Sequence, residues 1–150
     1  MRKITSFPVV FLSLFVTTLV SCGNDYGKKI KIEGTKGEVY YKPGIAGSEA
    51  RKVSDLLKEI GFLGNEKGAS IQVIKEQEGL YTVRFVYNKE YYDKTEGLEN
   101  GFKQYGAKIS RAVFHSAKVN IALADNRFRD YKVIPYDEAV AKSLESETGQ

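Results

Sequence analysis

The sequence predicts a single α+β domain: a two-layer sandwich with two helices on one face of a mainly antiparallel sheet, in a ferredoxin-like or related split arrangement. Apolar residues repeat at helical spacing in two separate segments. Segments rich in β-branched and aromatic residues flank and separate them, which gives the order strand, helix, two strands, helix, two strands. Two helices that each carry one apolar stripe can both bury it on one face of a sheet.

The first 21 residues predict a signal peptide that precedes this domain. A short basic start, Arg2 and Lys3, is followed by the uncharged and mostly apolar run 7–20. A helix needs about 20 apolar residues to span a bilayer, so this shorter run fits the core of a signal peptide better. The open alternatives are an uncleaved anchor and an ordinary secreted protein.

The run ends in Leu19-Val20-Ser21-Cys22, which resembles the bacterial lipobox. The resemblance identifies a lipoprotein precursor and implies diacylglycerol on the Cys22 thiol, cleavage before Cys22 and attachment to the membrane through this lipid. Gly23, rather than an aspartate, follows the cysteine, as in lipoproteins that are sorted to the outer membrane. Cys22 is the only cysteine, so no disulfide can form within one chain.

The remaining chain divides into a lipidated N-terminus and tether at 22–29, the α+β domain at 30–135 and a polar C-terminal tail at 136–150. Of the 23 basic residues, Arg2 and Lys3 lie in the signal, which leaves 21 against 19 acidic residues, a net charge of +2. This near balance excludes a polybasic nucleic-acid binder. We expect the tail to be a frayed helix or disordered.

The first half of the domain contains two short strands and the best-supported helix. The strands are expected at 29–33 and 38–42, where Pro43-Gly44 ends the second. Ser48 is the predicted N-cap of the helix, with Glu49 in its first turn. Gly61 is the predicted C-terminal stop, with Phe62 folding back on the helix. The apolar stripe consists of Val53, Leu56, Leu57 and Ile60.

The second half begins with a predicted hairpin of strands at 70–76 and 80–88. A long helix is expected at 95–114, and strands at 118–124 and 127–134 turn at Asp125-Asn126. In the strand at 80–88 the face expected to pack on the helices is Tyr81, Val83, Phe85 and Tyr87. The stripe of the long helix is Leu98, Phe102, Tyr105, Ile109 and Val113.

From Glu38 to Ile134 this rhythm also resembles small, uncharacterised α+β domains of the bacterial envelope. The resemblance lies in hydrophobic rhythm and contains no chemical motif, so it implies a fold and no activity. The matching pieces are Val39-Tyr40-Tyr41, Gly61-Phe62, Tyr81-Thr82-Val83-Arg84-Phe85 and the segment from Val119-Asn120-Ile121 to Asp125-Asn126-Arg127-Phe128.

Few residues suggest catalysis. His115 is the only histidine, and neither Ser110 nor Ser116 lies in a nucleophile-elbow pattern, so we read His115 as a residue at a helix end. Zinc would need three or four His or Cys ligands, and Asp125, Asn126 and Asp130 lack the spacing of a calcium loop. We therefore expect no metal and no cofactor.

Tyrosines are the one enrichment with a functional interpretation. The candidate binding surface is Tyr87, Tyr91 and Tyr92 where a strand leaves the sheet, together with Tyr40 and Tyr41. Tyrosines that edge the core, with hydroxyls in water, are the plainer interpretation. Two functions stay open: a non-catalytic envelope module that binds a protein or glycan partner, and a small carboxylate-dependent hydrolase acting on an envelope peptide or glycan.

Overall fold

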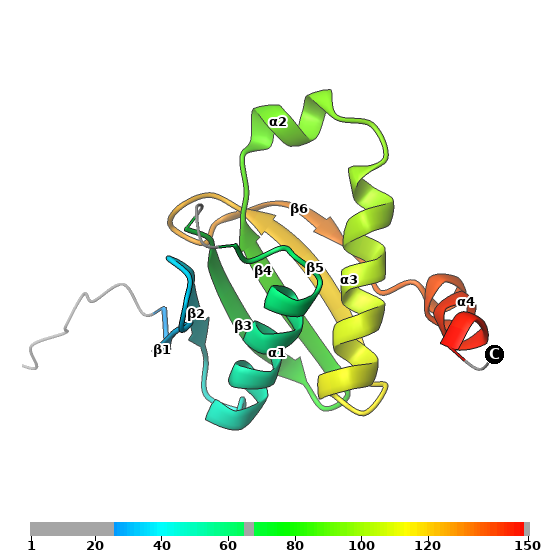
Figure 1. The fold of residues 1–150 in the computed structure, drawn as a ribbon, viewed down its shortest axis with the longest axis horizontal. Coiled ribbons are helices and arrows are strands. Elements are labelled where there is room, and N and C mark those ends of the chain that lie inside the picture. Colours follow the sequence, from blue (N-terminus) through cyan, green and yellow to red (C-terminus); the bar gives the residue numbers. More distant parts are fainter. Residues whose placement is uncertain (1–25, 65–67, 149–150) are drawn as a thin grey trace, which may run out of the picture.

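The computed structural model describes residues 26–64 and 68–148, which fold into an α+β domain around one mixed sheet (Figure 1). In this part of the chain six strands lie side by side in chain order, and four helices accompany them. The strands are β1 (Lys28–Lys31), β2 (Glu38–Tyr41), β3 (Ser70–Gln77), β4 (Leu80–Val86), β5 (Lys118–Ala124) and β6 (Asp130–Ile134). The helices are α1 (Gly47–Glu59), α2 (Lys89–Lys94), α3 (Leu98–Val113) and α4 (Glu138–Thr148).

The α+β class is confirmed, and the described sheet is mixed, with three antiparallel and two parallel strand pairs. The pairs β1–β2, β3–β4 and β5–β6 are antiparallel, whereas β2–β3 and β4–β5 are parallel. A split β-α-β unit has another strand between its two parallel strands. Here each parallel pair consists of hydrogen-bonded neighbours, so a ferredoxin-like arrangement is not confirmed.

The two crossovers have opposite handedness. β2 and β4 run in opposite directions, because β3 is parallel to β2 and antiparallel to β4. Both crossovers step the same way across the sheet, and α1 and α3 lie against each other on the same face (Figure 1). This combination requires one right-handed and one left-handed crossover, although about 98% of such connections are right-handed.

The core lies between this helix pair and the sheet. The predicted stripes supply it: Val53 and Leu57 of α1 and Phe102, Ile109 and Val113 of α3 are buried. Leu56, Leu98 and Tyr105 are only partly buried. Val83 and Phe85 of β4 are buried in this core, which confirms the predicted inward side of that strand. The sheet as a whole contributes one face of each central strand: Val39, Ile71, Val73, Val83, Phe85, Ile121 and Leu123.

Helix α1 starts earlier than predicted and ends where predicted. Its N-cap is Ala46, two residues before Ser48, and Glu49 Oε2 accepts a hydrogen bond from the Ala46 N–H at 2.7 Å. Gly61 has a positive φ of 76°. The N–H groups of Gly61 and Phe62 donate to the carbonyls of Lys58 and Leu57, which is the Schellman pattern.

The long helix predicted at 95–114 begins later than expected. Gly97 has a φ of 80°, and α3 begins only after it, at Leu98. Residues 89–94 form a separate helix, α2, where the sequence predicted an irregular exit from the strand. Gly106 brings α3 close to β5, because a Cβ there would lie 3.0 Å from the carbonyl oxygen of Val119.

The β5–β6 connection is the hairpin turn that the sequence predicts. Asp125 Oδ1 accepts hydrogen bonds from the N–H groups of Arg127 and Arg129, at 2.9 and 3.0 Å. The Arg129 guanidinium, with these backbone donors, lowers the pKa of Asp125 to about 2. Phe128 adopts a φ of 56° in this turn, so β6 begins at Asp130 rather than at 127.

The two ends of the domain also differ from the predicted boundaries. Lys28 and Lys29, which the sequence places in the tether, belong to strand β1. The tail at 136–150 contains α4, which packs against α3. Within the described ranges, no helix is both long enough and apolar enough to cross a membrane.

Candidate functional site

The tyrosine segment is held in place by β4 and by the cap of α2. Tyr87 directly follows β4, and its backbone N–H donates to the carbonyl of Ala124 at 3.1 Å. Asn88 is the N-cap of α2, and its Oδ1 accepts the N–H of Tyr91 at 2.8 Å. This cap fixes Tyr91 in the first turn of α2, where 56% of its surface is exposed.

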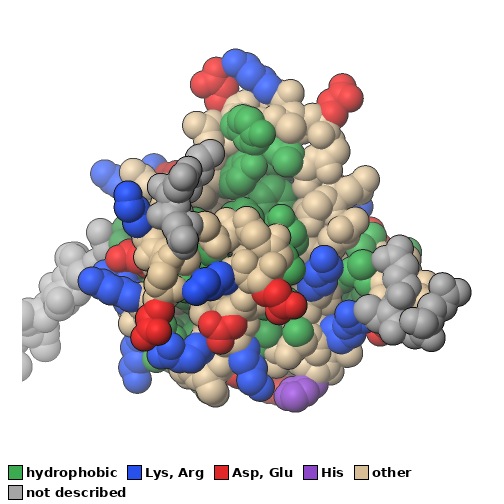
Figure 2. All heavy atoms as spheres, in the orientation of Figure 1, with side chains coloured by type: hydrophobic (Ala, Val, Ile, Leu, Met, Phe, Trp, Pro, Cys, Tyr) green, Lys and Arg blue, Asp and Glu red, His purple; other side chains and the backbone are tan. Residues whose placement is uncertain are grey.

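Tyr87 and Tyr91 line a common hollow, which we call the tyrosine hollow. It has a volume of about 550 Å³, within the range of roughly 300–1,000 Å³ that is typical of ligand pockets. No charged side chain lines it among the described residues. Figure 2 shows hydrophobic side chains gathered below α2. The described lining residues are Phe62, Gly68, Ala69, Val86, Tyr87, Asn88 and Tyr91.

A continuous aromatic cluster supports this hollow from below. Tyr87 lies 6.1 Å from Tyr91 and meets Phe102 edge-on at 5.3 Å between ring centroids. Phe62 meets Phe85 edge-on at 4.8 Å and Tyr105 at 5.7 Å. Edge-to-face pairs in this distance range are favourable beyond the area that they bury. The floor of the hollow is therefore fixed by core packing, while its rim at Tyr91 is open.

Burial also changes the chemistry of the tyrosine hydroxyls. Burial raises the pKa of Tyr87, and the neighbouring phenols of Tyr91 and Tyr105 add to this rise. The carbonyl of Tyr87 accepts a hydrogen bond from the Tyr131 hydroxyl at 3.2 Å. Tyr87 is therefore a neutral, firmly placed wall of the hollow at ordinary pH.

The other three predicted surface tyrosines lie elsewhere. Tyr92 is partly buried and turns toward α3, where its ring lies 6.4 Å from Phe102 and its hydroxyl donates to Glu99 at 3.3 Å. Tyr40 faces the opposite side of the sheet and packs edge-on against Tyr26 and Phe128 at 5.8 and 5.5 Å.

Tyr41, the neighbour of Tyr40, points to the helix side because successive strand residues alternate. It lines a second hollow of about 320 Å³, the Gly27 hollow, formed by Gly27, Lys28, Tyr41, Lys42, Pro43 and Ile45. The five candidate tyrosines thus occupy separate places, and only Tyr87 and Tyr91 share one. Cys22, the predicted lipidation site, lies outside the described residues.

No catalytic arrangement emerges from the described residues. His115 is exposed beyond the end of α3, with a φ of 51°, and the hydroxyl of the buried Ser110 donates to the carbonyl of Ala117. In the described ranges, no group of three His, Cys, Asp or Glu residues is placed to hold a metal ion.

Several acidic side chains are used in ion pairs, helix caps and turns. Four described carboxylates have shifted pKa values, and all four are lowered: Glu38 by hydrogen bonds from Tyr40 and Lys29, Glu99 by Lys132, Asp125 by Arg129, and Asp137 by the Val140 N–H and Lys103. A glycosidase acid needs the opposite, a raised pKa.

Sequence reasoning missed the part of the hollow that comes from another segment. Phe62 was expected only as the contact that closes α1, and Gly68 and Ala69 had no predicted role. These residues approach Tyr87 because β3 and β4 pair antiparallel, which places the start of β3 beside the end of β4. The missed signal for α2 was Asn88 itself, a good N-cap followed by Glu90 in the first turn.

Comparison with known proteins places the domain in a family. No curated protein and no solved structure matches the chain. One family model, described as the AF_1994_N family N-terminal domain, matches residues 29–134. The match runs from the second residue of β1 to the end of β6, and so includes the sheet except for Lys28, together with α1, α2 and α3. The chain therefore belongs to the AF_1994_N N-terminal domain family.

Proposed function

We propose that this protein is a lipoprotein of the bacterial outer membrane, anchored through lipid on Cys22, and that it binds an envelope partner without catalysing a reaction. The observation that carries the binding role is the tyrosine hollow, which has a volume of about 550 Å³, no charged side chain among its described lining residues, and Tyr91 exposed at its rim. Exposed aromatic side chains beside an apolar pocket are typical anchors of protein interfaces.

The chemistry of the lining favours a protein partner that inserts an apolar or aromatic side chain. Phe62, Ala69 and Val86 offer apolar groups, and the described residues of the lining include no charged group to recognise an ion. A glycan partner is the second outcome of the test, because tyrosine rings and the Asn88 amide can also contact sugars. A two-layer sandwich would suit this role. The helices α1 and α3 would form one layer and the sheet the other, and the tyrosine hollow would stay accessible to a partner at the end of the sheet.

A carboxylate-dependent hydrolase is the alternative, and the electrostatics support it less. The lowered pKa values of Glu38, Glu99, Asp125 and Asp137 make these groups poor general acids near neutral pH. Among the residues that the structure describes, no carboxylate lines the tyrosine hollow. Hydrolysis of an envelope peptide or glycan by the purified protein, abolished by one carboxylate substitution, would replace the binding proposal.

The test is capture of partners from solubilised envelopes with the lipidated protein. Tyr91→Ala should strongly reduce the capture of a specific partner, because it removes the exposed aromatic group at the rim. Val133→Ala is the matched control, since Val133 is similarly exposed, at 51% against 56% for Tyr91, and lies on β6 outside the hollow. Equal capture by wild type and Tyr91→Ala would contradict the proposed surface.

A further inference from the structure

Positive charge is concentrated in the segment that follows the proposed anchor. Residues 28–42 contain five lysines and two glutamates, a net charge of +3, whereas the whole chain after the signal has only +2. Lys28, Lys29 and Lys31 lie on β1, an edge strand of the described sheet, and all three are exposed. Lys29 is paired with Glu38 at 3.0 Å, so Lys28 and Lys31 are the stronger contributors to the local potential.

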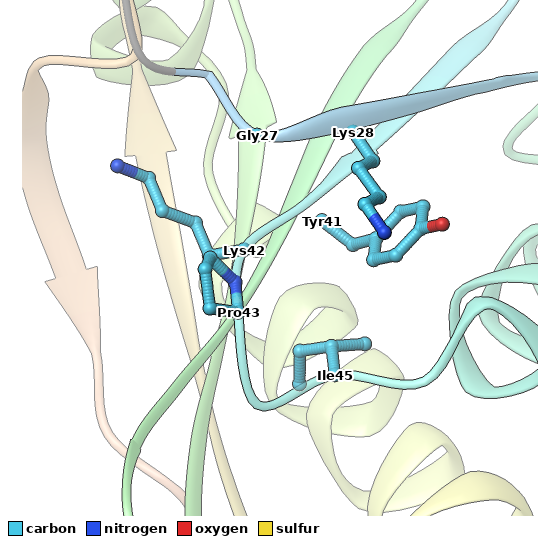
Figure 3. A pocket seen from close by; sticks show the side chains of 6 residues that line it. All are labelled: Gly27, Lys28, Tyr41, Lys42, Pro43 and Ile45. Atoms are coloured by element: carbon cyan, nitrogen blue, oxygen red, sulfur yellow. The ribbon is translucent and has the colours of Figure 1, made fainter.

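The Gly27 hollow opens within this basic segment. Its walls are Tyr41, Pro43 and the buried Ile45, and Lys28 stands at its rim. Figure 3 shows the Lys28 side chain beside the Tyr41 ring, while Lys42 extends the opposite way. The pairing of Lys28 with Tyr41 between β1 and β2 fixes this neighbourhood. The hollow thus combines apolar walls with one ammonium group at the entrance.

The backbone at Gly27 keeps the hollow next to the chain that leads to Cys22. Gly27 has a φ of 87°, and a Cβ there would lie 2.3 Å from the carbonyl oxygen of Tyr41, so only glycine fits. Five residue steps separate Gly27 from Cys22, a distance of at most about 18 Å even when fully extended. A lipid on Cys22 would therefore hold the Gly27 hollow close to the membrane surface.

We propose that the Gly27 hollow binds the headgroup region of an anionic phospholipid in the membrane that carries the anchor. The phosphate contacts the Lys28 ammonium, and the glycerol and first methylenes of the lipid contact Tyr41, Pro43 and Ile45. Glu49 is the acidic residue in the first turn of α1, and its carboxylate accepts a hydrogen bond from the Ala46 N–H. This inference deepens the proposed membrane attachment and rests on it.

The experiment uses the mature chain from Cys22 to Gln150 with Cys22→Ser, so that no lipid is attached. Flotation with phosphatidylcholine vesicles that contain increasing phosphatidylglycerol should show binding that rises with the anionic fraction and falls with salt. Lys28→Gln should lower the partition coefficient roughly fivefold, since a lysine near an anionic surface contributes about 1 kcal/mol. If no lipid were found on Cys22 in cells, the proposed anchor would be wrong. The vesicle experiment would still test the Gly27 hollow, because it uses protein without lipid.

Two matched variants distinguish a site from a diffuse basic surface. Lys31→Gln removes the same charge from the same strand outside the hollow, and Lys94→Gln removes it from α2. A larger loss for Lys28→Gln than for Lys31→Gln, with no loss for Lys94→Gln, supports the site. Equal losses for Lys28 and Lys31, or no binding to anionic vesicles, would overturn it.

A second measurement reads the hollow directly. Soluble short-chain phosphatidylglycerol should shift the NMR amide signals of Gly27 and Tyr41, and Lys28→Gln should weaken the shift. Equal shifts with inorganic phosphate at the same concentration would indicate a simple anion site and contradict the lipid assignment.

Discussion

Truncation of Leu57 tests the packing of α1 on the sheet. Leu57 is fully buried, at 0% exposure, whereas its neighbour Leu56 is only partly buried against the same core. Leu57→Ala removes three carbon atoms, which corresponds to about 2.4 kcal/mol at about 0.8 kcal/mol for each methylene. The cavity left behind adds to this loss, so we expect a total of about 3–4 kcal/mol, a large part of the roughly 5–15 kcal/mol of a typical domain. Leu56→Ala should cost about 1 kcal/mol.

Urea unfolding of the two variants measures this difference. With a slope of about 1–3 kcal/mol per molar urea, Leu57→Ala should lower the midpoint by about 1–4 M at an unchanged slope. The adjacent leucines are a matched pair because they share residue type and helix and differ in burial. Equal losses in both variants, or a loss below about 1 kcal/mol for Leu57→Ala, would show that α1 does not bury this face as described.

Three further predictions concern the anchor, the binding surface and the β5–β6 turn. Mass spectrometry of the mature protein should find acyl chains on an N-terminal Cys22, and an unmodified thiol on membrane-bound protein would contradict the lipobox interpretation. Tyr91→Ala should change the free energy of unfolding by less than about 1 kcal/mol, because Tyr91 is exposed, while it weakens partner capture; unfolding of this variant would show that Tyr91 is a core residue. The Arg129 guanidinium lowers the pKa of Asp125 to about 2, so the charged Asp125 stabilises the fold above pH 4 and this stabilisation is lost as the pH falls toward 2. The difference in melting temperature between wild type and Asp125→Asn should therefore shrink over that range, and a constant difference would contradict the ion pair.

The elements with local signals were predictable from the sequence. The α1 stripe, its stop at Gly61 and the inward face of β4 depend on residue spacing and on one left-handed glycine, and all three are confirmed. The predicted N-cap of α1, Ser48, was wrong. The actual N-cap is Ala46, which has no capping side chain, and Glu49 accepts a hydrogen bond from its N–H instead. The predicted start of the long helix at residue 95 was wrong because Gly97, with its positive φ, is the N-cap of α3 and the helix begins only at Leu98.

The strand order was not predictable, because it depends on pairing between segments far apart in the chain. Nothing local distinguishes a crossover to the next strand from one that skips a strand. The general preference for right-handed crossovers would even argue against two helices on one face with this order. The five candidate tyrosines also do not form one continuous surface, and here the reason is a local rule. Tyr40 and Tyr41 are adjacent in sequence, yet strand alternation places them on opposite faces.

The two hollows lie at opposite ends of the strands, and this constrains how both could work in one molecule. The Gly27 hollow is formed at the end of β2, by Tyr41 and the residues after it. The tyrosine hollow is formed before the start of β3 and after the end of β4. Because β3 is parallel to β2 and antiparallel to β4, the start of β3 and the end of β4 lie level with the start of β2, whereas Tyr41 is at the end of β2. A domain that rests on the membrane through Lys28 therefore presents Tyr91 away from the bilayer, where a partner can reach it. A partner that bound Tyr91 only when the anchor was removed would contradict this orientation, and with it the pairing of the two proposals.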